Sequence, residues 1–250
     1  MIVSGGIKTF STLSSYLKTR KGDPACFVDT SILFSATYDS DAFNSESELA
    51  FDLLAEAGLS VFTNVNVRSE FLENHRRVLI PEILIDLLAT KGSQLDSVLH
   101  EKLKSHRTSY QKKVAEEKNT KMDQIQIKIW RRLLLEYSLD DVDGWTLFCR
   151  DFLKGKIRRI WQDTEKFFAL NFISSRIGEE NPYLDQIPTW ENAVDLMERY
   201  GLASFDAMIV NMFLCSKISL LLTADLEMAD CVNKESNSAK IVFVPDSALR

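Results

Sequence analysis

The chain has 250 residues, of which 45% are apolar and 26% are charged. This composition is ordinary for a soluble globular protein and excludes disordered, collagen-like and membrane-spanning classes. The length fits one domain with a large insertion or two small domains. The first ten residues, MIVSGGIKTF, lack the basic flank and apolar run of a signal peptide, so we expect a cytoplasmic protein with no membrane partner.

The charge is unevenly spread along the chain. The net charge of −6 argues, taken alone, against a protein that binds nucleic acid by neutralising phosphates. Residues 101–160, however, hold 15 Lys and Arg against 9 Asp and Glu, whereas the other 190 residues hold 15 against 27. The sequence therefore contains a basic segment inside an acidic frame.

The four cysteines, at positions 26, 149, 215 and 231, have no C-x-x-C spacing, and the chain has only three histidines. We therefore expect no structural zinc site. We also expect reduced thiols, because disulfide frameworks serve small secreted domains.

The first third of the chain alternates between predicted strands and helices. Residues 1–24 form an N-terminal extension that ends in the turn signal Lys21-Gly22-Asp23-Pro24. A buried strand is predicted at 25–29, a helix at 45–58 ending in a glycine cap, and a second strand at 59–63. Asn64 is placed to cap the helix that follows. The helix at 45–58 is expected to bury a stripe formed by Leu49, Phe51, Leu53 and Leu54.

The segment from 78 to 199 changes to long helical patterns. Pro81 suits a first helical turn, and apolar residues at 83, 84, 87 and 88 follow at helical spacing. Residues 122–137 repeat at steps of three and four; the alternation of Ile125, Ile127 and Ile129 also allows a strand, but the length of the pattern favours a helix. Acids at 140, 141 and 143 with Gly144 mark a break, and helices are predicted again at 145–176 and 189–200.

The alternation returns near the C-terminus, with a helix predicted at 204–216, strands at 218–223 and 240–244, and a short helix after Asp225. Alternating strands and helices are typical of a parallel sheet covered by helices. The sequence thus predicts an α/β domain split into residues 24–77 and 200–250, with a helical insertion at 78–199.

Four acids fall where such a sheet would bring them together. Asp29 closes the first predicted strand and Asp225 follows the strand ISLLLT, and ligand sites in parallel sheets lie at the carboxyl ends of strands. Asp206 lies in the first turn of a helix, and Glu70 lies in the helix after the second strand. Crowded carboxylates repel one another unless a cation neutralises them, so we expect a hard ion such as Mg²⁺ or Mn²⁺.

The segments around these acids resemble the ordered motifs of PIN-domain ribonucleases, among them the toxin halves of VapBC toxin-antitoxin pairs. The motifs are CFVDTSIL at 26–33, SEFL at 69–72, FDAMIV at 205–210 and LLTAD at 221–225. The resemblance covers about half the chain. The chain departs from the family in two places. The family has no equivalent of the segment at 78–199, and many members have an aromatic residue where this chain has Met228.

The resemblance implies a three-layer α/β/α fold with a central parallel sheet and a metal-dependent ribonuclease. Asp29, Glu70, Asp206 and Asp225 would be both the metal-binding and the catalytic residues, with one or two Mg²⁺ or Mn²⁺ ions. Thr30, Ser31 and Thr223 would hydrogen-bond to these carboxylates. RNA is the implied substrate, and an antitoxin protein and a second copy of the chain are the implied partners.

Each acid also has a purely structural interpretation. Asp29 and Asp225 could cap helices, Asp206 would be favoured by the helix dipole, and Glu70 could pair with Arg68 or Arg77. Glu73 could replace Glu70 at a metal, and Asp230 could be an auxiliary acid.

Two other classes of function compete with the ribonuclease. A phosphatase of the HAD-like type needs a second Asp two residues after the first, where this chain has Ser31. A non-catalytic PIN-like module that binds RNA or protein is the main alternative.

The basic insertion offers candidate RNA contacts that combine cations with aromatic rings. The alternative is that the cations are solvated helix faces and that both tryptophans are turned into the core. The candidate residues are Trp130, Arg131, Arg132, Arg158, Arg159 and Trp161.

Overall fold

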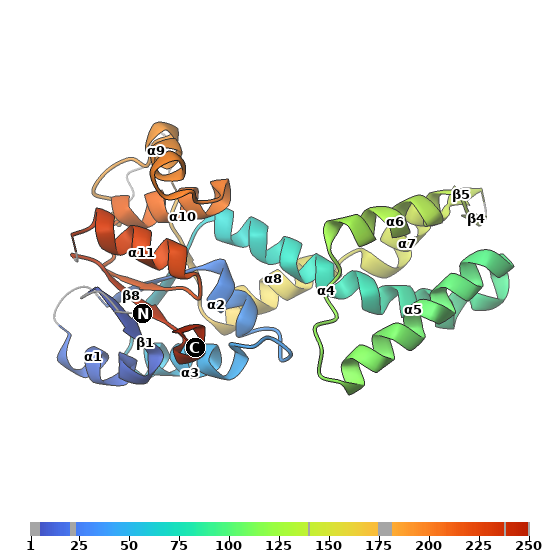
Figure 1. The fold of residues 1–250 in the computed structure, drawn as a ribbon, viewed down its shortest axis with the longest axis horizontal. Helices are drawn as coiled ribbons and strands as arrows, with labels where there is room; N and C mark the ends of the chain where they lie inside the picture. The colour runs from blue at the N-terminus through green and yellow to red at the C-terminus, as the bar shows by residue number, and fades with distance from the viewer. Residues whose placement is uncertain (1–5, 21–23, 140, 175–181, 238, 250) are drawn as a thin grey trace. The chain divides into compact units, whose positions relative to one another are not determined.

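The computed structural model, shown in Figure 1, describes residues 6–20, 24–139, 141–174, 182–237 and 239–249. Parts of three predictions lie outside these residues: the turn signal at 21–23, the acid at 140 and the end of the helix predicted at 145–176. The chain divides into two compact units, one of residues 1–71 and 163–250 and the other of residues 72–162.

The first unit is built on a six-stranded sheet in which all the described pairings are parallel, in the order β1-β8-β7-β2-β3-β6. This confirms the predicted α/β class with a parallel sheet. The two central strands, β2 and β7, are buried along their whole length, which explains why they appear in the sequence as continuous apolar runs. The strands are β1 (Ile7–Thr9), β2 (Ala25–Val28), β3 (Ser60–Thr63), β6 (Asn171–Phe172), β7 (Leu220–Leu222) and β8 (Ile241–Val244).

Helices flank this sheet. Figure 1 shows α10 (Ser204–Cys215) and α11 (Leu226–Glu235) on one side of it, with α9 (Trp190–Tyr200) outside them. On the other side lie α1 (Leu13–Thr19), which follows the short helix η1 (Phe10–Thr12), and α3 (Asn44–Glu56). The helix α2 (Thr30–Ser35) follows β2 directly, and η4 (Asp246–Leu249) follows β8.

Two segments form strands of the six-stranded sheet that the sequence did not predict. Ile7–Thr9, in the predicted N-terminal extension, pairs with β8 as an edge strand. Asn171–Phe172, where a helix was predicted, pairs with β3 as the other edge. The helical pattern before this strand ends at Phe167, the last residue of α8 (Lys156–Phe167), and Ala169 has a positive φ of 49°. Residues 163–199, predicted as part of the insertion, belong to the unit that contains the sheet.

The second unit is helical and has its own apolar core. It contains most of α4 (Val65–Lys91), α5 (Ser97–Ala115), α6 (Gln124–Leu135), α7 (Gly144–Phe148) and the π-helix η3 (Cys149–Leu153). Short elements join them: η2 (Gly92–Gln94) and the antiparallel pair β4 (Ser138–Leu139) and β5 (Val142–Asp143). The core includes Ile80, Ile83, Leu84, Leu103, Ile127 and Phe148.

The sequence predicted that Pro81 begins a helix. That prediction is wrong, because Pro81 lies inside the 27-residue helix α4. A proline in a helix interior leaves the carbonyl four residues earlier without its N–H donor. Here that carbonyl belongs to Arg77, and the backbone N–H of Met122 donates to it at 3.0 Å. The Arg77 side chain donates in return to the Met122 carbonyl at 2.8 Å. Tertiary hydrogen bonds therefore replace the one that proline removes.

The helix α6 settles the choice between helix and strand at 122–137. Ile125 and Ile129 are 70% and 43% exposed, whereas Ile127 and Leu134 are 4% and 1% exposed. In α3, likewise, Phe51 and Leu54 are buried but Leu49 is 57% exposed.

The four cysteines are free thiols, as expected. Among the described residues, the helices include none that combines the length and the apolar character needed to cross a bilayer.

Candidate functional site

The site is positioned by the point in the sheet where the strand order reverses. β2 lies between β3, the next strand along the chain, and β7, from near the C-terminus. Val28 is in register with Leu222, and the backbone N–H of Asp29 donates to the Leu222 carbonyl at 3.0 Å. Ligands of open parallel sheets bind outside the carboxyl ends of strands at such a reversal. Asp29 and Asp225 therefore stand at the edge where a ligand is expected.

Asp29 is a buried carboxylate with its two oxygens in different surroundings. The residue is 3% exposed, and its Oδ2 accepts hydrogen bonds from Ser31 Oγ at 2.7 Å and Thr223 Oγ1 at 2.9 Å. Among the residues that the structure describes, Oδ1 has no hydrogen-bond partner. Burial raises the pKa of Asp29, although the hydrogen bonds from Ser31 and Thr223 oppose the rise.

Ser31 and Thr223 link the two strand ends to each other. Ser31 Oγ accepts from the backbone N–H of Ala224 at 2.9 Å, and Thr223 Oγ1 accepts from that of Asp225 at 3.0 Å. These two hydroxyls thus hydrogen-bond around Asp29, as expected from the sequence. The hydroxyl of Thr30 instead donates to the Val67 carbonyl, at 3.5 Å, and Thr30 lowers the pKa of Asp29 through its backbone N–H.

Asp206 brings the four acids into one electrostatic group. It lies in the first turn of α10, half-buried. Its pKa is raised to about 7, first by burial and then by the negative charges of Asp29, Glu70 and Asp225, with a contribution from Glu227. The other three acids that the sequence selected are therefore close enough to Asp206 to disfavour its ionisation.

Glu227 is a member of this group that was not predicted from the sequence. It lies in the first turn of α11, where the helix dipole favours an acid whether or not a site is present. Its sequence context therefore carries no signal that would assign it to a site.

Asp29 and Asp225 also cap helices, which is the structural role that the sequence suggested for them. Asp29 caps α2 through a bond from the Ser31 N–H, and Asp225 caps α11 through Oδ1, which accepts from Glu227 N at 2.8 Å and Met228 N at 3.0 Å. Capping occupies Oδ2 of Asp29 and Oδ1 of Asp225, so a capping role does not use Oδ1 of Asp29.

The acids fit a hard cation by donor chemistry, because every one of them presents carboxylate oxygens. Oδ1 of Asp29, without a partner among the described residues, and the mutual repulsion felt at Asp206 are both conditions that a cation would relieve. In the described part of the chain, however, no three His, Cys, Asp or Glu side chains converge closely enough to hold an ion. The site thus contains the carboxylates that a metal site requires, but among the described residues they are not close enough together to coordinate one ion.

The two auxiliary acids suggested by the sequence have other partners. The Glu73 carboxylate accepts two hydrogen bonds from Arg76, at 2.7 and 2.8 Å, and one from the Gln124 amide. Lys234 forms an ion pair with Asp230 at 2.5 Å.

The candidate RNA contacts in the second unit divide by exposure. Arg131, Arg132, Arg158 and Arg159 are all exposed. Trp130 is partly buried against the core of its unit, and Trp161 is only 3% exposed. Base stacking on Trp161 does not fit this burial: the strongly amphipathic α8 turns that ring inward and its arginines outward.

Comparison of the chain with models of known families, with curated proteins and with solved structures finds no match.

Proposed function

We propose that the protein is a metal-dependent endoribonuclease of the PIN type, with Asp29, Glu70, Asp206 and Asp225 as the metal-binding and catalytic residues. The observation that carries the proposal is the buried Oδ1 of Asp29 at the reversal of strand order, which has no partner among the described residues. Beside it, burial and the neighbouring acids together raise the pKa of Asp206 to about 7. Perturbed carboxylates at a sheet switch point are typical of functional sites.

The roles follow from the contacts of each side chain. Asp29, fixed by Ser31 and Thr223, would present Oδ1 to the ion, and Asp206 would supply a second carboxylate. Glu70 and Asp225 would complete the charge of the site. A bound Mg²⁺ or Mn²⁺ supplies hydroxide near neutral pH and stabilises negative charge on a phosphate.

The test is RNA cleavage by the full chain with Mg²⁺ or Mn²⁺, with and without chelator. Asp29→Asn keeps the shape of the side chain but removes its charge, so we expect cleavage to fall by at least ~100-fold, the loss of a principal electrostatic contribution to the transition state. Asp52→Asn, which neutralises an exposed acid on α3 of the same unit, is the matched control and should cleave normally. Equal cleavage by the two variants would reject the assignment.

A second candidate is a PIN-like module that binds RNA or protein without cutting, and the lack of a closed ligand set among the described residues favours it. Mn²⁺ binding by the wild-type chain separates the two candidates, since the module would neither bind Mn²⁺ at this site nor cleave RNA.

A toxin role, with an antitoxin partner, predicts growth arrest on expression that disappears in Asp29→Asn.

A further inference from the structure

The second unit contains a small cavity that the proposed catalytic site does not use. It lies between α5 and α6 and the segment joining them, and it has a volume of about 120 Å³. Pockets for drug-sized ligands have volumes of about 300–1,000 Å³, so this one suits a single flat group. Its walls include His106, Ser109, Tyr110, Lys113, Gln126 and Trp130.

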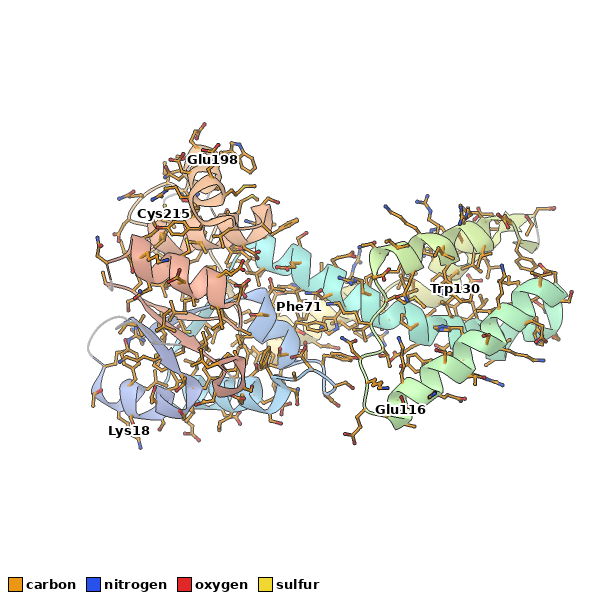
Figure 2. All side chains as sticks on the ribbon, viewed as in Figure 1. Lys18, Phe71, Glu116, Trp130, Glu198 and Cys215 are labelled. Carbon is orange, nitrogen blue, oxygen red and sulfur yellow. The ribbon has the colours of Figure 1, made fainter. Side chains whose placement is uncertain are left out.

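Three of the residues that line the cavity, His106, Tyr110 and Trp130, carry aromatic rings. The His106 and Trp130 rings are 5.4 Å apart between centroids and are inclined at 69°, and the Tyr110 ring lies 6.2 Å from that of His106. Because His106 and Trp130 meet edge to face, they make two adjoining walls instead of a stacked pair. Trp130, labelled in Figure 2, is only partly buried. Planar aromatic surfaces of this kind accommodate the bases of single-stranded nucleic acid.

The polar atoms of the cavity match the edge of a base, which carries both donors and acceptors. His106 Nε2 lies 2.9 Å from the Pro81 carbonyl, so it donates there and leaves Nδ1 of the neutral ring as an acceptor. Gln126 Oε1 accepts from the backbone N–H of Asp123 at 2.9 Å, which leaves the Gln126 amide N–H₂ as a donor. The residues that line the cavity therefore include an acceptor and a donor whose groups are oriented by their other hydrogen bonds.

The charge of the lining favours a nucleotide over a free anion. Lys113 is the cation among the described lining residues, and burial together with Lys113 lowers the pKa of His106, which keeps that ring neutral. One ammonium group suits one phosphate of a chain, whereas the rings would contribute nothing to binding an inorganic phosphate.

We propose that this cavity binds one nucleotide of a single-stranded RNA, with the base against the adjoining His106 and Trp130 rings and the adjoining phosphate at Lys113. The proposal gives the ribonuclease a second contact with its substrate, and it rests on the proposed function for the choice of RNA as ligand.

The test measures the affinity of the full chain for a 5′-fluorescein-labelled single-stranded RNA of about 12 nucleotides, within the range of typical single-strand sites, by fluorescence anisotropy. EDTA is present, so that neither a metal nor cleavage takes part. Ser109→Phe fills the cavity without removing a core side chain, and we expect about a tenfold loss of affinity, the size of one lost base contact. Ser105→Phe, an exposed position one turn earlier on α5 that does not line the cavity, is the matched control and should bind as the wild type.

A second pair of variants tests the phosphate contact. Lys113→Gln should weaken binding about threefold and reduce the slope of log affinity against log salt by ~0.7, the value for one contact on a single strand. Lys112→Gln removes the same charge from the neighbouring position, outside the cavity, and should leave the slope unchanged.

Two results would overturn the proposal: equal affinity of Ser109→Phe and Ser105→Phe, or displacement of the RNA by inorganic phosphate as effectively as by uridine or adenosine 5′-monophosphate. Because EDTA is present, these results are independent of the catalytic test. Absence of Mg²⁺- or Mn²⁺-dependent cleavage by the wild type, together with a selective binding defect in Ser109→Phe, would reject the nuclease and keep the cavity.

Discussion

At the scale of single residues, the site holds carboxylates whose charges disfavour the ionisation of Asp206, and no cation of the described residues hydrogen-bonds to Oδ1 of Asp29. Asp29 is held in a buried position by two hydroxyls, and only one of its oxygens is satisfied within the described residues. Its charge is one reason that Asp206 resists ionisation. Functional sites often keep such unfavourable groups because a ligand compensates them.

The raised pKa of Asp206 predicts how the stability of the metal-free protein depends on pH. The folded-state pKa, about 7, lies above the ordinary value of 3.8, so between these values the folded state holds more protons than the unfolded state. The free energy of unfolding therefore falls as pH rises from about 4 to about 7 and levels off above that. Asp206→Asn removes this dependence.

We expect Asp206→Asn to be more stable than the wild type at pH 8, in EDTA, by ~1–2 kcal/mol. The expected difference in unfolding free energy starts from ~1.4 kcal/mol for each unit by which the pKa is raised. It is then reduced, because solvent partly screens the half-buried carboxyl. At pH 4 the two proteins should unfold alike. Urea unfolding at several pH values measures the difference, with Asp52→Asn as the control for charge; parallel stability curves for wild type and Asp206→Asn would contradict the prediction.

At the scale of elements, the strands and helices around the site could be predicted because local signals and tertiary packing agree there. β2, β3, β7 and β8 are short apolar runs bounded by turns, and Asn64 caps α4 as expected, accepting from the Asn66 and Val67 N–H groups. The order of the acids at strand ends followed from the same pattern. What the pattern could not supply was the distance between carboxylates, which depends on side-chain packing across four separate elements.

The failures of prediction occur where tertiary contacts decide between locally equivalent choices. α6 has apolar side chains on more than one face, so periodicity alone does not show that Ile127 and Leu134 face the core and Ile125 does not. The two-residue edge strand β6 has too few residues to show a period, and its pairing with β3 defines it. Pro81 is of a type that usually begins a helix, but the hydrogen bond from Met122 overrides that preference.

That hydrogen bond gives a prediction for hydrogen exchange. The Met122 amide precedes α6 yet donates to the Arg77 carbonyl. That carbonyl is available as an acceptor because Pro81 has no N–H to donate to it. It should therefore exchange slowly, like amides inside α4. Pro81→Ala introduces a competing N–H, and the Met122 amide should then exchange about 2–10 times faster, as expected for loss of one net hydrogen bond.

The Leu99 amide, which donates to the capping Asp96 side chain in the same unit, is the internal reference and should not change. NMR-detected exchange on the full chain resolves both amides. Fast exchange at Met122 in the wild type would show that the interaction does not replace the bond removed by proline.

At the scale of the whole molecule, the two units carry opposite net charges. Residues 72–162 hold 18 Lys and Arg against 13 Asp and Glu, a balance of +5, which leaves 12 against 23 for the other unit, a balance of −11. The overall −6 therefore conceals a basic unit with exposed arginines and an acidic unit that contains the carboxylate group. This division fits a protein in which one unit attracts RNA and the other holds a cation, since net charge averages the two.

The charge division predicts a specific salt dependence for RNA binding. Arg158→Gln with Arg159→Gln removes two exposed cations from the basic unit, so the slope of log affinity against log salt should decrease by ~1.4 for a single strand. Lys18→Gln with Lys217→Gln removes the same charge from exposed positions of the acidic unit and should leave the slope unchanged. Anisotropy titrations of the labelled RNA between about 50 and 200 mM salt, a range over which phosphate contacts are readily separated, measure both slopes. Equal slopes in the two double variants would show that RNA is attracted by overall charge and not by the arginines of α8.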